Sequence, residues 1–206
     1  MVALFRLLRP KQWTKNLLVL AALVFTGSYT HPQVVATALL AFVAMCCVSS
    51  STYIYNDVQD VERDRLHPKK KNRPIASGEV SRPVALVVAV VMLVAGVSAA
   101  FVLGTGSLKI VVAYLVLQIL YNGALKKIPV ADVYSIATGF VLRAAVGAAA
   151  IQVSISGWLL FCTGALALMV GFGKRRNEYI QQGEDRSSTR QSLIHYNREA
   201  LDAMVL

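Results

Sequence analysis

Residues 55–64 read YNDVQDVERD, and they directly follow a long apolar stretch, Val34 to Ile54. On an α-helix, at 100° per residue, Asp57, Asp60 and Asp64 fall within about 60° of one another. Three carboxylates on one stripe repel each other strongly unless a cation lies between them. The pattern therefore predicts a cation site at the end of an apolar helix.

The donor chemistry of this stripe indicates which cation it holds. All the side chains offer oxygen, with no His or Cys among them, and this favours a hard ion such as Mg²⁺. Mg²⁺ usually shares its coordination shell with a substrate phosphate, so we expect a diphosphate bound through magnesium. The predicted metal ligands are Asn56, Asp57, Asp60 and Asp64, and the three aspartates are the predicted catalytic residues.

The rest of the chain has the composition of a multi-span membrane protein. Its 206 residues are 56% hydrophobic, with a mean hydropathy of +0.55. Such values lie outside the range of ordinary soluble domains. We predict an all-α, polytopic membrane helical bundle that forms a single transmembrane domain over residues 1–206. Its six predicted spans, each near the length that crosses about 30 Å of hydrocarbon, are about 13–30, 34–55, 84–103, 109–125, 133–153 and 157–173.

The charges are distributed as membrane topology requires. All but two of the 21 Lys and Arg residues fall on one side, in the N-terminus and in loops 56–83, 126–132 and 174–198. The connections on the other side contain no Lys, Arg, Asp or Glu. The positive-inside rule then places the N-terminus and these loops in the cytoplasm. The net charge of +10 is therefore a consequence of topology, and we expect no nucleic-acid partner.

Several stretches resemble one known family. NDVQDVERD at 56–64 is similar to the first aspartate motif, NDxxDxxxD, of the UbiA superfamily of intramembrane prenyltransferases. The chain most resembles the branch of decaprenyl-phosphate phosphoribosyltransferases. The stretches that carry this resemblance are RPKQWTKNLL at 9–18, DRLHPKKKNRPIASGEVS at 64–81, DVYSIATGFVLRAAVGA at 132–148 and GKRRNE at 173–178.

The resemblance implies nine transmembrane helices around a cavity that opens to the cytoplasm and to lipid. This chain covers about six of them, and a further apolar segment starts at 200–206, so we expect the sequence to be truncated. The family also implies Mg²⁺ as cofactor, 5-phosphoribosyl 1-diphosphate as donor and a polyprenyl (decaprenyl) phosphate as acceptor. The expected location is the bacterial inner (plasma) membrane, with the active site facing the cytoplasm.

One departure from the superfamily pattern bears on the substrate. Most members resemble a design with a second aspartate motif after the sixth helix. Here that loop opens with Lys174, Arg175 and Arg176, and its acidic residues are only Glu178, Glu184 and Asp185. A basic loop attracts phosphate directly rather than through a second metal ion. This favours a reaction with one Mg-bound diphosphate and further phosphate groups to neutralise.

Arg143 is an ionisable residue within an apolar span, where charged side chains are costly and usually face a cavity or a partner. It shares a helical stripe with Asp132, about 16 Å deeper in the span. Two interpretations stay open for it: a contact with substrate phosphate, or a structural salt bridge to another helix.

Basic and polar residues on the cytoplasmic side are candidates for phosphate contacts. Attraction to an anionic leaflet explains many of the loop cations, and we assign Lys69 and Lys71 to it. The predicted substrate-binding residues are Lys15, Asn16, Asn56, Arg65, Lys70, Arg73, Lys126, Asp132, Arg143, Lys174 and Arg175.

The predicted function is Mg-dependent transfer of 5-phosphoribosyl to a polyprenyl phosphate, for cell-wall arabinan synthesis. The first alternative is transfer of a prenyl group from a prenyl diphosphate to an aromatic or quinone acceptor. It requires Glu178, Glu184 and Asp185 to serve as a second metal site. The second alternative is a non-enzymatic protein that binds anionic polyprenyl lipids through the basic loops.

Overall fold

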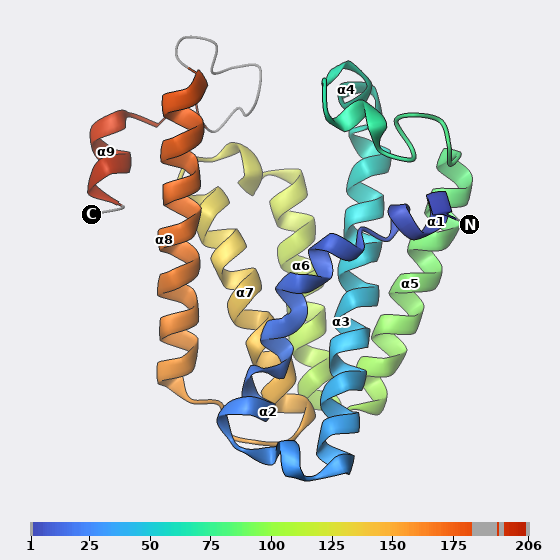
Figure 1. Ribbon diagram of the computed structural model, residues 1–206, viewed down its shortest axis with the longest axis vertical. Coiled ribbons are helices and arrows are strands. Elements are labelled where there is room, and N and C mark those ends of the chain that lie inside the picture. Colours follow the sequence, from blue (N-terminus) through green and yellow to red (C-terminus); the bar gives the residue numbers. More distant parts are fainter. Residues whose placement is uncertain (1, 183–192, 194–195, 205–206) are drawn as a thin grey trace. The chain divides into compact units, whose positions relative to one another are not determined.

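The computed structural model describes residues 2–182, 193 and 196–204, and within them every regular element is a helix. Figure 1 shows their arrangement. The elements are α1 (Val2–Leu7), η1 (Pro10–Leu20), α2 (Ala21–Phe25), η2 (Ser28–Thr30), α3 (Pro32–Gln59), α4 (Val61–Leu66), η3 (Lys70–Asn72), α5 (Arg82–Val102), α6 (Thr105–Gly123), η4 (Leu125–Lys127), α7 (Ala131–Ala150), α8 (Gly157–Gln182) and α9 (Arg198–Ala203), where η marks a 3₁₀ helix.

Five of these helices are long and apolar enough to cross a membrane, namely α3, α5, α6, α7 and α8. They correspond to the second to sixth predicted spans. The first predicted span, 13–30, has a different form: 3₁₀ helix η1 passes into the short helix α2, which ends before Gly27 at φ 69°. In addition, α8 continues to Gln182, so the predicted loop 174–198 begins as helix.

The chain divides into two compact units. Unit 1 comprises Met1–Leu115 and Arg143–Ser154, and unit 2 comprises Val116–Leu142 and Ile155–Leu206. In unit 1, α3 and α5 lie side by side (Figure 1). Small residues allow this close approach, as in other membrane helix pairs. At Gly96 of α5, an added Cβ would lie 2.8 Å from the carbonyl oxygen of Ala44 on α3.

Gly147 of α7 permits an even closer approach in unit 1. An added Cβ there would lie 1.8 Å from the backbone oxygen of Val19 in η1. The backbone of η1 therefore rests directly on α7, at a position where any side chain would block it. Val19 itself is buried.

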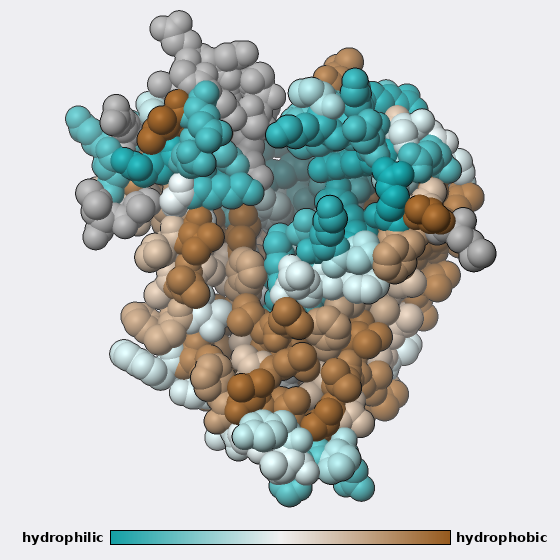
Figure 2. All heavy atoms as spheres, in the orientation of Figure 1, coloured by the Kyte–Doolittle hydropathy of each residue, from teal (hydrophilic) through white to brown (hydrophobic). Residues whose placement is uncertain are grey.

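An apolar cluster at the end of α3 supports the segment that follows it. Leu7 of α1, Ile54 of α3 and Val61 of α4 are buried together, and Ile75 and Val80 join them from the loop before α5. Hydrophilic side chains gather on the surface over α4 and this loop (Figure 2). The cluster thus anchors a polar cap to an apolar helix pair.

In unit 2, the start of α7 packs against the C-terminal part of α8 and the segment around α9. Val133, Phe172 and Leu201 are buried in one cluster with Leu193 and Tyr196. In the preceding part of α8, large apolar side chains are exposed, as expected of a lipid-facing helix; they include Trp158, Phe161, Leu166, Met169 and Val170.

We expect Gly147→Ala to lower the free energy of unfolding by about 1–3 kcal/mol, because the new methyl group cannot fit against the Val19 backbone. Thermal unfolding in detergent measures this. The matched control is Gly106→Ala, where the added Cβ meets only the Cβ of Ala149, at 3.7 Å. If the two variants unfold at the same temperature, the close approach of η1 to α7 is contradicted.

Candidate functional site in the two units

The aspartate stripe lies at the junction of two helices. Asp60 ends α3 and precedes α4, with φ −90° and ψ 6°, so the predicted continuous helix is interrupted there. The interruption does not separate the flanking carboxylates. Asp57 and Asp64 are both buried, at 3% and 2% exposure, and they bind the same guanidinium.

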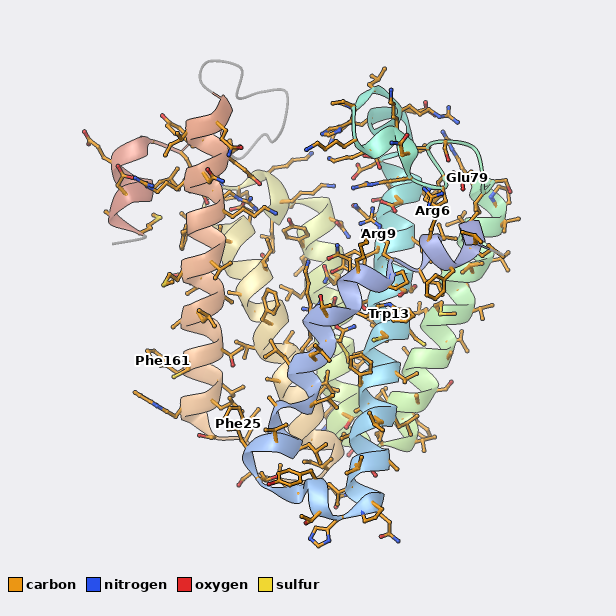
Figure 3. All side chains as sticks on the ribbon, in the orientation of Figure 1. Arg6, Arg9, Trp13, Phe25, Glu79 and Phe161 are labelled. Atoms are coloured by element: carbon orange, nitrogen blue, oxygen red, sulfur yellow. The ribbon has the colours of Figure 1, made fainter. Side chains whose placement is uncertain are left out.

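That guanidinium belongs to Arg73, from the loop before α5. Its Nη1 donates to Asp57 Oδ1 at 3.0 Å and to Asp64 Oδ2 at 2.5 Å. Arg9 donates to the same Oδ1 of Asp57 and stacks over the ring of Tyr53, at 5.6 Å from its centroid. Arg9 has a left-handed φ of 54° at the start of η1, and it lies over α3 in Figure 3. Two arginines thus neutralise two buried aspartates.

Asn56 stands next to this cluster with an unsatisfied acceptor. Its Oδ1 is buried and has no hydrogen-bond partner among the described residues. Such an orphaned acceptor is costly, at about 1–3 kcal/mol. Among the residues that the structure describes, no three His, Cys, Asp or Glu side chains converge as a metal-binding group. The carboxylates of Asp57 and Asp64 face Arg73. The chemistry still fits Mg²⁺, because carboxylate and amide oxygens are the ligands that this ion prefers.

The remaining loop residues of unit 1 hold the cap together. Arg65 donates from Nε to the carbonyl oxygen of Ala76 at 3.3 Å. His67 Nδ1 accepts from the backbone N–H groups of Lys69 and Lys70, at 3.1 and 3.3 Å. Arg6 of α1 and Glu79 form an ion pair (Figure 3). The substrate contacts of Arg65 and Lys70 stay predictions.

Arg143 is buried within unit 1, at 4% exposure, and contacts two other segments. Its Nε donates to Asn16 Oδ1 and its Nη2 donates to Tyr114 Oη, each at 2.8 Å. The guanidinium also lies 4.9 Å from the centroid of the Tyr114 ring. Asn16 in turn donates to Ser49 Oγ at 3.1 Å. This network links η1, α3, α6 and α7. The two side chains recorded as accepting from Arg143 are neutral, whereas the structural interpretation expected a salt bridge, and the substrate contact of Arg143 stays a prediction.

In unit 2, two of the predicted substrate-binding residues, Asp132 and Arg175, bind each other. Arg175 donates from Nε to Asp132 Oδ2 at 2.8 Å and from Nη1 to Glu178 Oε2 at 2.9 Å. Arg175 is 2% exposed and Asp132 is fully buried. Removing either partner of such a buried ion pair strongly destabilises a protein, because the other charge stays buried without compensation. Asp132 and Arg175 therefore have a structural role in this unit, and their substrate contacts stay predictions.

Tyr196 completes the unit 2 network. Its Oη donates to Asp132 Oδ1 at 2.9 Å and accepts from the backbone N–H of Val130 at 2.5 Å. Burial raises the pKa of this phenol to about 12, with the Asp132 carboxylate also raising it and the Val130 N–H lowering it. The hydroxyl is therefore a proton donor at every physiological pH.

The other predicted basic residues lie nearer the surface. Lys15 on η1 and Lys174 on α8 are exposed, and Lys126 on η4 is half-buried. Glu184 and Asp185, which the prenyl-transfer alternative needs, lie outside the described residues. Glu178 is within them and binds Arg175.

Sequence reasoning missed three residues that the structure places in these networks: Arg9, Tyr114 and Tyr196. Arg9 lies inside the quoted stretch RPKQWTKNLL, so the motif itself was a signal for it. Tyr114 and Tyr196 carried no such signal, because their hydroxyl partners are 29 and 64 residues away in sequence.

Comparison with known proteins identifies the family of this chain. Residues 16–200 match the model of the UbiA prenyltransferase family. The chain belongs to this family. It is 38% identical over 203 residues to a decaprenyl-phosphate phosphoribosyltransferase of Mycolicibacterium smegmatis, covering 96% of this chain and 64% of that protein. An enzyme of the same name from Corynebacterium glutamicum is 35% identical over 197 residues, with coverages of 94% and 59%. The chain thus spans less than two thirds of the length of these relatives.

Solved structures agree on the fold. A UbiA homolog from Archaeoglobus fulgidus, bound to GPP and Mg²⁺, superposes with a TM-score of 0.77 at 19% identity, covering 98% of this chain and 72% of that one. The prediction of an all-α membrane bundle of UbiA type is confirmed, and the protein is an integral membrane protein. Mg²⁺ binding by a member of the fold agrees with the predicted metal dependence.

We expect Arg73→Gln to destabilise the metal-free protein by about 2–3 kcal/mol, because Asp57 and Asp64 lose the guanidinium that they share. Added Mg²⁺ is expected to restore part of this loss, since it supplies positive charge to the same oxygens. Thermal unfolding in detergent, with EDTA or with Mg²⁺, measures both effects. Arg82→Gln is the control, because its partner Glu62 is exposed and such pairs contribute little. Equal melting of both variants, with no response to Mg²⁺, contradicts the shared role of Arg73.

Proposed function

We propose that this protein transfers 5-phosphoribosyl from 5-phosphoribosyl 1-diphosphate to a polyprenyl phosphate, with Mg²⁺ as cofactor. The observation that carries the proposal is the identity of 35–38% to decaprenyl-phosphate phosphoribosyltransferases over more than nine tenths of the chain. The oxygen ligands at the end of α3 support it, because they suit a Mg-bound diphosphate. In cells, the product serves cell-wall arabinan synthesis.

The proposed metal ligands are Asn56, Asp57, Asp60 and Asp64. Bound there, Mg²⁺ supplies Lewis-acid stabilisation of the negative charge on the leaving diphosphate. The buried Asn56 Oδ1, which has no recorded hydrogen-bond partner, would be one of the oxygen ligands. Arg9 and Arg73, which contact the Asp57 carboxylate, would bind phosphate oxygens beside it. Guanidinium groups suit this task because their paired N–H groups match the spacing of phosphate oxygens.

The reaction exchanges one bond at C1 of the ribose. The bond from C1 to the diphosphate oxygen breaks, and a phosphate oxygen of the acceptor forms the new bond to C1. Positive charge develops on the ribose, as in other glycosyl transfers. The acceptor is already an anion at neutral pH, so no general base is required. The role of the protein is to hold the two substrates in the geometry of attack.

Further phosphate contacts are assigned by charge and exposure within each unit. Lys15 of unit 1 and Lys126 and Lys174 of unit 2 are proposed to bind phosphate groups of donor or acceptor. The surrounding membrane is proposed to be the bacterial plasma membrane, with the N-terminus and the aspartate stripe on the cytoplasmic side. The charge distribution supports this orientation.

The test is an assay of the detergent-solubilised protein with radiolabelled 5-phosphoribosyl 1-diphosphate, polyprenyl phosphate and Mg²⁺. We expect label in an organic-extractable lipid, lost on addition of EDTA. Asp57→Asn and Asp60→Ala are each expected to lower the rate at least about a hundredfold, because the leaving group loses its charge stabilisation.

Glu62→Gln is the matched control for these variants. Glu62 lies between the aspartates in sequence, but its side chain is 71% exposed and pairs only with surface arginines among the contacts recorded for it. Its activity is expected to stay near that of the wild type. Transfer of label from a prenyl diphosphate to an aromatic acceptor, with no phosphoribosyl transfer, supports the first alternative. Lipid binding without turnover of either donor supports the second.

A further inference from the structure

Tyr196 joins the segment before α9 to the start of α7 in unit 2. Its ring is buried in the apolar cluster with Val133, Phe172 and Leu201. Asn197 caps α9 by accepting from the N–H of Ala200 at 2.6 Å. The apolar cluster thus fixes the Tyr196 ring, and the hydroxyl lies at the beginning of α7.

The proton positions at this hydroxyl follow from the chemistry of its partners. The N–H of Val130 can only donate, so Oη accepts from it. The one phenolic proton is then left for the Asp132 carboxylate. Asp132 is held in turn by Arg175 at 2.8 Å. Each hydrogen bond in this series, from Val130 through Tyr196 and Asp132 to Arg175, therefore has a defined donor and acceptor.

Val130 has a backbone conformation that its side chain disfavours. Its φ is 67°, in the left-handed region, where a β-branched residue is a true outlier. Such a residue persists only when its surroundings hold it there. Its carbonyl oxygen accepts from the N–H groups of Val133 and Tyr134 at 3.1 and 2.9 Å, and its side chain packs against the apolar cluster. On the N–H side of its φ torsion, the recorded contact is the hydrogen bond to Tyr196.

The conformation of Val130 sets the course of the basic turn before it. Lys126 and Lys127 lie on η4, which ends only three residues before Val130, and α7 begins one residue after it. A change of φ at Val130 would therefore reorient the turn relative to α7. Fixing φ at Val130 therefore helps to fix the orientation of the Lys126–Lys127 turn relative to α7.

We infer that Tyr196 is a positioning residue: its hydroxyl keeps Val130 left-handed and so fixes the Lys126–Lys127 turn at the start of α7. The inference rests on the proposed function only for what this turn binds, a phosphate group of a substrate. The geometric part stands on contacts within unit 2 alone. It predicts that the segment around α9 contributes to substrate affinity without touching the substrate.

The test compares Tyr196→Phe, which keeps the buried ring, with the wild type in limited trypsin digestion of the folded protein. We expect cleavage after Lys126 or Lys127 to be about tenfold faster in the variant, because one hydrogen bond that holds the turn is lost. Cleavage after Lys69–Lys71 in unit 1 is the internal control and stays unchanged. Tyr134→Phe, whose ring is exposed on α7, is the matched variant and is expected to digest like the wild type.

A second variant separates this role from general packing. Glycine adopts a positive φ without strain, so Val130→Gly no longer needs to be held. In that background, Tyr196→Phe is expected to accelerate cleavage less than about threefold. An equal effect in both backgrounds, or no effect of Tyr196→Phe in the wild type, overturns the inference.

Kinetics tie the result to the proposed reaction. In the labelled-donor assay, Tyr196→Phe is expected to raise KM severalfold and to change kcat less, because it loosens a binding turn. If the wild type makes no labelled lipid, the proposed function fails while the digestion result still decides the role of Tyr196. If the wild type is active and both KM and cleavage are unchanged, the positioning role fails alone.

Discussion

A guanidinium inside an apolar helix must find polar partners, because the hydrocarbon around the helix offers none. Arg143 meets this requirement with the side chains of Asn16 and Tyr114, which lie on two different segments. Asn16 extends the network to Ser49 on α3. One buried charge therefore joins η1, α3, α6 and α7 within unit 1, and the close contact at Gly147 brings η1 near enough to reach it.

In both units, buried carboxylates are paired with arginine side chains. In unit 1, Arg9 and Arg73 neutralise Asp57 and Asp64. In unit 2, Arg175 lies between Asp132 and Glu178. The difference lies in exposure. The Arg73 side chain is partly open to solvent, whereas the Arg175 side chain is buried.

Sequence reasoning predicted an all-helical membrane bundle from long apolar runs and the aspartate stripe from helical periodicity, because both signals are local. It also singled out Arg143, since one charge in an apolar span is visible without a structure. It could not choose between a substrate and a structural partner, because Asn16 and Tyr114 are brought to Arg143 only by tertiary packing. The interruption at Asp60 was likewise out of reach, since no proline or glycine lies at that position. The 3₁₀ form of η1 was out of reach as well, because Pro10 at its start suits the first turn of any helix.

The residues of the network around Arg143 are also synthesised in a particular order. Its recorded partners Asn16 and Tyr114, and Ser49 beyond them, all precede position 143 in the chain. Synthesis runs from the N-terminus, and earlier segments can fold first. A growing chain that has reached α7 therefore already contains every one of these acceptors. The helix with the costly charge is made last among them, so the polar side chains that its arginine contacts are already present when α7 is added.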